Sequence, residues 1–159
     1  MTRRLLALVQ SDSRRSLGEL ARIAGSSRSA VHRRLQRLRH TGIIRQDVAL
    51  LDRRRLGHVQ TFIIRLELRQ KHRQRFDRFL SLVRDLPEVQ QCYITTGRLN
   101  CIAVVLLPDA DALDAFVEEH FAHNPLVRSY RTSLVTRELK VSLVVPVPKP
   151  GEDGESPYP

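Results

Sequence analysis

Apolar residues recur at intervals of three and four in three stretches of the first third of the chain. The stretches cover residues 3–10, 17–24 and 27–41, and polar or charged residues fill most of the other positions in them. This period is that of an amphipathic helix with one face against a core. The sequence therefore predicts three short helices before residue 42.

Polar residues and a glycine mark the ends of the second and third helices. Ser16 has Glu19 three residues after it, which is the spacing of a capping box. Gly25 follows the second helix, as expected of a residue that ends one, and Ser26 or Ser27 caps the next. Two helices joined by a tight glycine turn form a helix-turn-helix pattern.

The residues after the third helix have a looser pattern. Residues 43–51 alternate weakly between apolar and polar, which suggests a short wing or hairpin, and residues 52–57 form a polar hinge. We therefore predict a winged helix-turn-helix domain that covers residues 1–57, hinge included.

The second half of the chain mixes strand and helix periods. The pattern predicts strands at 59–69, 89–96, 101–107 and 127–136, a further candidate strand at 141–147, and helices at 70–85 and 109–123. The order β-α-β-β-α-β is that of a ferredoxin-like α+β domain. We expect this domain to cover residues 58–147. Residues 148–159 are rich in Pro, Gly and acidic residues and are expected to form a disordered tail.

The net charge is confined to the first of these domains. Residues 1–57 hold 14 arginines, no lysine and 4 acidic residues, a net charge of +10. The remaining residues hold 10 arginines, 3 lysines and 13 acidic residues, a net charge of zero. A positive charge at one end of a chain is typical of a protein that binds a polyanion, most often nucleic acid.

Several classes of protein are disfavoured by composition. No run of 18 apolar residues predicts a membrane span, and the start of the chain lacks the pattern of a signal peptide. Two cysteines and no export signal indicate the reducing cytoplasm. With no Trp and 5% aromatic residues, a stacking platform for single-stranded nucleic acid is not expected. No nucleophile–base set, P-loop or dinucleotide fingerprint is present, so we expect neither an enzyme nor a cofactor.

The third predicted helix, from Ser27 to Thr41, has the pattern of a recognition helix. On a helical wheel Val31, Leu35 and Leu38 cluster on one face, which must meet the core. In a helix-turn-helix the N-terminal residues of the second helix reach base edges in the major groove. The residues expected there are Arg28, Ser29, His32 and Arg33, with Gln36 deeper along the helix.

Residue chemistry divides these contacts into two kinds. Arg suits the O6 and N7 atoms of guanine, and Gln suits the N6 and N7 atoms of adenine. The side chains expected on phosphates, which give affinity without sequence information, are those of Arg34, Arg37, Arg39 and Arg45. The alternative is a solvated cationic face on an ordinary helix, which the capped helix, the glycine turn and the charge asymmetry disfavour.

An ordered set of residues runs through both halves of the chain. In the first half it consists of Leu20, Ala21, Gly25, Ser27, Val31, Arg34, Leu35, Leu38, Gly42, Ile43, Ile44, Asp52, Leu56 and Gly57. In the second half it consists of Leu86, Pro87, Glu88, Val89, Cys92, Tyr93, Thr96, Gly97 and Val127. This set resembles the leucine-responsive regulator/AsnC (Lrp/AsnC) family of bacterial and archaeal transcription factors. The resemblance covers residues 5–146, and no single motif decides it.

The resemblance implies a helix-turn-helix joined to an αβ-sandwich (RAM) domain that dimerises and assembles further, often to octamers. It also implies a small effector, commonly an amino acid, that binds between dimers near the strand-joining Thr-Gly loop. By match, the effector-loop residues are Thr96, Gly97 and Asn100. The alternative is that Thr96 and Gly97 are ordinary hairpin-turn residues.

The chain departs from the family pattern at three places. The usual acidic stretch before the first helix is missing, and Asn100 and Cys101 stand where an acidic and an aromatic residue are frequent. A carboxylate would pair with the ammonium group of an amino acid, whereas Asn offers neutral hydrogen bonds.

Two other functions with the same two-domain plan remain as alternatives. One is an enzyme similar to the siroheme decarboxylases, for which residues 96–101 offer no histidine. The other is an assembly module with vestigial DNA binding, against which the intact helix pattern and the arginines argue. The favoured prediction is a cytoplasmic, homo-oligomeric and sequence-specific regulator that binds a roughly palindromic site on double-stranded DNA.

The two cysteines and the histidines near residue 120 do not predict a second functional site. In a hairpin centred on Arg98, Cys92 lies opposite Val104 rather than Cys101, so core packing is expected instead of a disulfide. His120 and His123, with Glu119, have a spacing that a metal can use, but such pairs are usually surface residues. No metal site is therefore predicted.

Overall fold

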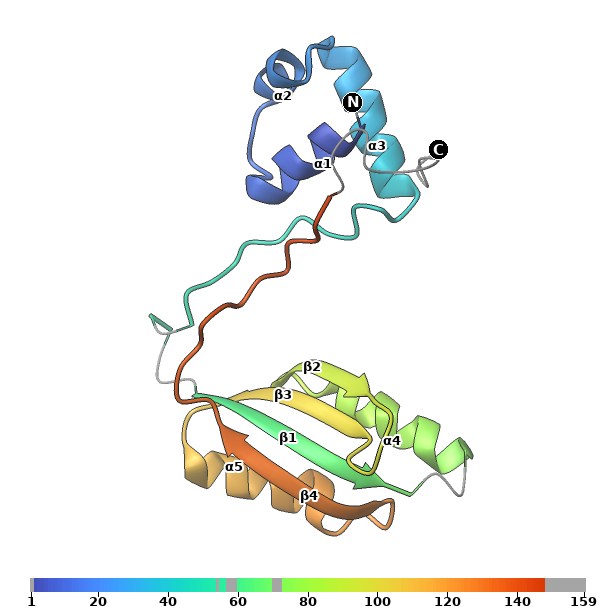
Figure 1. Cartoon of the computed structure of the whole chain (residues 1–159), viewed down its shortest axis with the longest axis vertical. Coiled ribbons are helices and arrows are strands. Elements are labelled where there is room, and N and C mark those ends of the chain that lie inside the picture. The colour runs from blue at the N-terminus through green and yellow to red at the C-terminus, as the bar shows by residue number, and fades with distance from the viewer. Residues whose placement is uncertain (1, 54, 57–59, 70–72, 148–159) are drawn as a thin grey trace. The chain divides into compact units, whose positions relative to one another are not determined.

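Three helices at the start of the chain enclose one small core. The computed structural model describes residues 2–53, 55–56, 60–69 and 73–147. The helices are α1 (Thr2–Ser11), α2 (Leu17–Ala24) and α3 (Arg28–His40) (Figure 1). They are the three helices that the pattern predicts. Their shared core consists of Leu5, Leu6, Leu20, Ala21, Val31, Leu35 and Leu38.

Local capping fixes where α2 and α3 begin and end. The Glu19 N–H donates to Ser16 Oγ at 3.2 Å, and the Ser16 N–H donates to the Glu19 carboxylate at 3.0 Å, which completes the predicted capping box. Gly25 ends α2 with φ +62°, in the left-handed region that favours glycine. Ser27 caps α3 by accepting from the Ala30 N–H at 3.2 Å.

The predicted wing is not formed. Residues 43–53 contain no strand, and the Ile44 N–H donates to the Leu38 carbonyl at 3.0 Å. Ile43 and Ile44 pack against the helical core, and the residues from 45 to 52 are exposed. An alternating sequence makes a hairpin only if a partner strand lies beside it, and among the described residues this stretch has none.

The second half forms a four-stranded antiparallel sheet in the order β2-β3-β1-β4 (Figure 1). Its strands are β1 (Gln60–Leu68), β2 (Val89–Ile94), β3 (Cys101–Leu107) and β4 (Val127–Leu134). The helices are α4 (Arg73–Asp85) and α5 (Ala110–Val117), which continues as a π-helical turn over Glu118–Ala122. This is the predicted ferredoxin-like order.

One face of this sheet is buried under the two helices. Alternate residues of β1 and β3 point into a core that Phe79 of α4 and Phe116 and Phe121 of the α5 region complete. The buried strand residues are Phe62, Ile64, Leu66, Cys101, Ala103 and Val105. Period-two burial is what the alternating sequence predicted for β1.

The chain after β4 returns to the N-terminal helices. The predicted strand at 141–147 is not formed; instead the Gln10 side chain of α1 donates to the Val145 carbonyl at 3.0 Å and accepts from its N–H at 2.8 Å. Val147 packs against the helical core. A side-chain amide thus supplies the backbone partner that a neighbouring strand would have supplied.

The two compact units therefore divide the chain differently from the predicted boundaries. Among the described residues, one unit holds residues 2–50 and 140–147, and the other holds those between Leu51 and Leu139. The sequence had assigned residues 140–147 to the second domain. The predicted tail, residues 148–159, lies outside the described residues.

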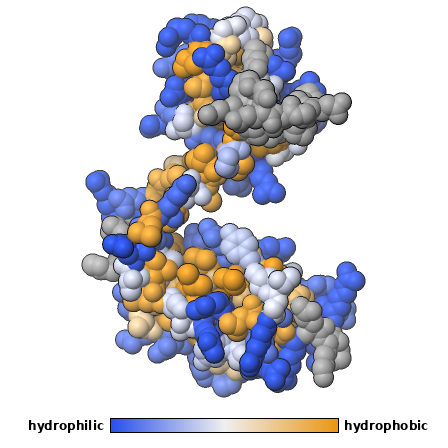
Figure 2. Space-filling model, viewed as in Figure 1, coloured by the Kyte–Doolittle hydropathy of each residue, from blue (hydrophilic) through white to orange (hydrophobic). Residues whose placement is uncertain are grey.

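Hydrophobic side chains are exposed along the segments that follow α3 and β4 (Figure 2). Both segments run without regular structure through these residues. The exposed residues include Val48, Leu50, Leu51 and Leu56 on the first segment, and Leu139, Val141, Leu143, Val144 and Val145 on the second.

Candidate nucleic-acid interface and effector loop

Helix α3 has one face in the core and the other in solvent. Val31, Leu35 and Leu38 are at most 4% exposed. Arg34 is half-buried, and the exposed residues include Arg28, Ser29, His32, Arg33, Gln36 and Arg37. Eight of the nine predicted DNA-contacting residues therefore lie on α3, and the ninth, Arg45, is exposed in the segment that follows it. Because the core face is fixed, the direction of the exposed face is fixed with it.

The arginines of α3 are mostly free of carboxylates. In the part of the chain that the structure describes, no ion pair involves Arg28, Arg33, Arg34 or Arg37. Arg39 differs, because its guanidinium pairs with Asp47, with Nη2 and Oδ2 at 3.0 Å. An arginine that is already neutralised is a poorer phosphate ligand, so Arg39 is the weakest of the four predicted phosphate contacts.

Arg28 differs from its neighbours in where its guanidinium lies. The group rests against Gly18 of α2, where a Cβ atom would come within 3.1 Å of Nη2. Ser29 contacts the cap of its own helix, since its Oγ lies 3.1 Å from Ser27 Oγ.

The β2–β3 hairpin holds the predicted effector loop. The Thr95 N–H donates to the Asn100 carbonyl at 2.9 Å, and Thr95 Oγ1 donates to the Leu99 carbonyl at 3.0 Å, so Thr95 closes the loop. Thr96 and Gly97 are exposed at its tip. Gly97 has φ +96°, which side-chain-bearing residues rarely adopt.

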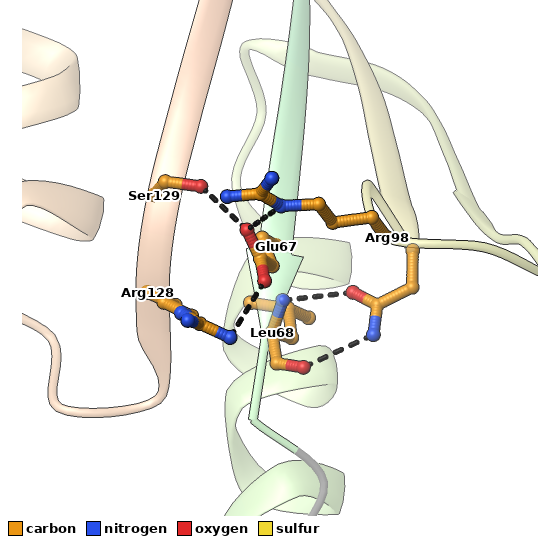
Figure 3. Close-up of polar contacts among 6 residues, drawn as sticks. Glu67, Leu68, Arg98, Arg128 and Ser129 are labelled. Carbon is orange, nitrogen blue, oxygen red and sulfur yellow. Dashed lines mark hydrogen bonds and ion pairs between the residues drawn. The ribbon is translucent and has the colours of Figure 1, made fainter.

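Asn100 fastens this loop to the end of β1. Its Oδ1 accepts from the Leu68 N–H at 2.8 Å, and its Nδ2 donates to the Leu68 carbonyl at 3.0 Å (Figure 3). A carboxylate would accept the first hydrogen bond but would repel the carbonyl oxygen. The amide therefore suits this position better than a carboxylate would.

A carboxylate that the sequence reading missed lies beside it. Glu67 is 7% exposed, and its oxygens contact Arg98 Nε at 2.9 Å, Ser129 Oγ at 2.9 Å and Arg128 Nη1 at 3.2 Å (Figure 3). The hydrogen bond from Arg98 holds the pKa of Glu67 below its ordinary value. Glu67 thus links β1, the effector hairpin and β4. The sequence signal for it is an acidic residue between the apolar Leu66 and Leu68.

The two cysteines are adjacent but reduced. Cys92 lies opposite Ala103, one residue from the predicted Val104, and its Sγ is 3.9 Å from that of Cys101. The hydrogen bond from Cys101 lowers the pKa of Cys92 to about 7, and the same hydrogen bond, together with burial, raises the pKa of Cys101.

The histidines on the helical segment before β4 have other contacts. His123 Nε2 lies 2.6 Å from Glu118 Oε1, and the His120 ring packs edge-on against Phe116. Within the described residues, no group of three or more His, Cys, Asp or Glu side chains is placed to hold a metal ion.

Comparison with known proteins identifies the family. The model of the AsnC-type helix-turn-helix domain matches residues 3–39, and that of the Lrp/AsnC ligand binding domain matches residues 61–145. An uncharacterized HTH-type transcriptional regulator of Sinorhizobium fredii is 32% identical over 143 residues, 90% of this chain and 85% of its own. The chain belongs to the Lrp/AsnC family.

Other Lrp/AsnC proteins agree over nearly the whole length. The leucine-responsive regulatory protein of Klebsiella pneumoniae is 29% identical over 88% of this chain and 85% of its own. An AsnC family regulator from Agrobacterium tumefaciens has a TM-score of 0.85 at 28% identity, covering 91% of this chain and 94% of its own. A regulator from Neisseria meningitidis, solved in complex with L-Met, has a TM-score of 0.84 at 29% identity with the same coverage.

The predicted family and function are confirmed, and the predicted fold class is confirmed apart from the wing. The protein is a DNA-binding transcriptional regulator of the Lrp/AsnC type with an effector-binding domain. The enzyme alternative finds no support among these relatives, whose names are those of transcriptional regulators. None of the helices in the described ranges is long and apolar enough to cross a membrane.

Proposed function

We propose that α3 enters the major groove and that the protein controls transcription from a roughly palindromic site. Ser29, His32, Arg33 and, deeper in the groove, Gln36 read base edges. Arg34, Arg37 and Arg45 contact phosphates. The observation that supports this most is a set of arginines on α3 that pair with no carboxylate of the described residues, on a helix whose other face is fixed by its core; they are Arg28, Arg33, Arg34 and Arg37.

The proposal also covers how copies of the chain assemble and where in the cell the protein acts. The second domain joins copies into a homo-oligomer, a dimer or larger up to an octamer, which places two recognition helices about one DNA turn or a multiple of it apart. Exposed apolar residues on the sheet of this domain favour such association; they include Tyr93, Ile94, Tyr130 and Leu134. We further propose that the protein acts in the cytoplasm, without a cofactor and without enzymatic activity.

The effector loop is the proposed sensor. A small molecule such as an amino acid binds at Thr96 and Gly97, and Asn100 holds the loop in place through Leu68. The L-Met complex of the relative from Neisseria meningitidis supports this class of effector.

Fluorescence anisotropy with the DNA upstream of the protein's own gene tests the proposal, with a shuffled sequence as the control. Tight, selective binding that weakens steeply with salt supports it. Weak binding without selectivity contradicts it and leaves an assembly module or an architectural DNA binder.

Arg33→Ala is expected to weaken binding to the specific site by about 1–3 kcal/mol and to relax selectivity, because one bidentate base contact is lost. Arg78→Ala, which removes an exposed arginine from α4, is the matched control and should leave binding unchanged. Equal affinity and selectivity in Arg33→Ala and the wild type would remove Arg33 from the recognition face.

Gly97→Asp is expected to abolish stabilisation by an effector, because a carboxylate then occupies the exposed loop tip. The measurement is the melting temperature with and without each of the common amino acids, beginning with L-Met. Gly97→Ala imposes the same backbone strain at φ +96° without the carboxylate and serves as the control. Stabilisation that survives in Gly97→Asp would place the effector elsewhere.

A further inference from the structure

Arg28 is the first residue of α3, yet its guanidinium lies over the first turn of α2. A Cβ atom at Gly18 would approach Arg28 Nη2 to 3.1 Å, Nε to 3.3 Å and Cζ to 3.4 Å. These three guanidinium atoms therefore lie against the position that a side chain at residue 18 would occupy. A Cβ atom there would require the guanidinium to shift by a few tenths of an ångström out of this position.

Gly18 has no backbone reason to be glycine. Among the described glycines, those with a positive φ are Gly25, Gly42 and Gly97. A glycine inside a helix costs about 0.5–1 kcal/mol relative to alanine. What Gly18 supplies in return is space, and Arg28 fills that space.

The guanidinium in this position lacks a counter-charge. The group carries a permanent positive charge and five N–H donors, and within the described residues Arg28 forms no ion pair. The acidic residue of the same turn, Glu19, is directed toward its own helix cap, since its Oε2 accepts from the Ser16 N–H and Oγ at 3.0 and 3.1 Å. A planar cation with free donors is suited to a phosphate.

The place of this cation relative to α2 indicates which part of DNA it meets. In a docked helix-turn-helix the second helix lies in the groove, while the first helix crosses the sugar–phosphate backbone. A group laid on the first helix is therefore next to phosphates. We propose that Arg28 is a backbone-phosphate clamp that Gly18 positions, so that it adds affinity without reading a base. The proposal rests on the DNA binding by α3 proposed above and changes the sequence-based role of Arg28 from base reading to phosphate binding.

The test compares Arg28→Ala with Arg33→Ala on the fragment that the wild type selects and on its shuffled control, across a salt series. Arg28→Ala is expected to weaken binding to both DNAs by the same factor, roughly tenfold. The slope of log K against log salt should also become less negative by about 0.9 for each copy of the chain in the complex. Arg33→Ala should weaken binding to the selected fragment far more than binding to the shuffled one.

Gly18→Ala tests the positioning separately. It should weaken binding to both DNAs alike, and the double variant Gly18→Ala/Arg28→Ala should bind no more weakly than Arg28→Ala. Thermal melting controls for folding, because alanine in a helix should leave α2 as stable or more stable.

The outcomes separate this inference from the proposed function. A selective loss in Arg28→Ala, or no loss, overturns the clamp while leaving α3 as the reading helix. An additive double variant overturns the role of Gly18. A wild type without selectivity overturns the proposed function itself and the clamp with it.

Discussion

The affinity of this protein for DNA is expected to fall about 10³- to 10⁵-fold when the salt concentration rises from 50 to 200 mM. Each phosphate that an arginine neutralises releases condensed counterions, and log K falls with log salt with a slope of about −0.9 per contact. The arginines placed on phosphates above are Arg28, Arg34, Arg37 and Arg45. Two copies on one site therefore make about eight such contacts, within the range of about six to ten that produces this loss.

A paired variant gives this prediction a residue-level check. Arg34→Ala/Arg37→Ala removes two contacts from each copy, so the slope in a dimeric complex should become less negative by about 3 to 4. Arg75→Ala/Arg78→Ala removes the same charge from exposed positions of α4 and should leave the slope unchanged. A similar change in both variants would mean that net charge, rather than the face of α3, sets the affinity.

The helices of the first unit were predictable because their signals are local. Ser16, Glu19 and Gly25 act within one turn of their own positions, so the sequence alone reveals the boundaries of α2. The buried face of α3 follows from the helical spacing of its apolar residues, which determines the face that meets the core. The same reasoning placed β3 at 101–107, because its continuous apolar run sits between turn residues.

The contacts that cross elements were not predictable from such signals. The Glu67 cluster joins three segments, with Arg98 and Arg128 lying 31 and 61 positions from it along the chain. The approach of Arg28 to Gly18 depends on the angle between two helices. The segment at 141–147 is apolar enough to be a candidate strand, yet a single glutamine on α1 satisfies Val145 instead. Tertiary partners, rather than local propensity, decided each case.

The effector loop shows that a match to family positions does not give the structural role of each residue. Thr96, Gly97 and Asn100 match the family by position, but the structure separates them by role: the first two are exposed at the tip and the third faces the Leu68 backbone. A residue type at a matched position does not by itself say whether its polar atoms are free. The hydrogen bonds to Leu68 answer that for Asn100.

On α3, Leu35→Ala is expected to lower the stability of the fold, whereas Gln36→Ala at the next position is expected to weaken DNA recognition. Leu35 is 4% exposed in the helical core, and its truncation should cost about 2–5 kcal/mol of unfolding free energy. A unit this small has little stability in reserve, so the helix-turn-helix should be largely unfolded at physiological temperature and DNA binding should be lost with it. Gln36 is exposed, and its truncation should change stability by less than about 0.5 kcal/mol.

Circular dichroism during urea unfolding measures the stability, and anisotropy measures the binding. Leu35→Ala should recover wild-type selectivity at a low temperature at which it is still folded, because its reading face is intact. Gln36→Ala should remain folded at every temperature at which the wild type is folded, and should bind the selected fragment more weakly by about 1–3 kcal/mol. A stable Leu35→Ala with altered selectivity, or an unfolded Gln36→Ala, would mean that α3 is rotated from the orientation described, and the assignment of Arg33 and Gln36 to base edges would be wrong.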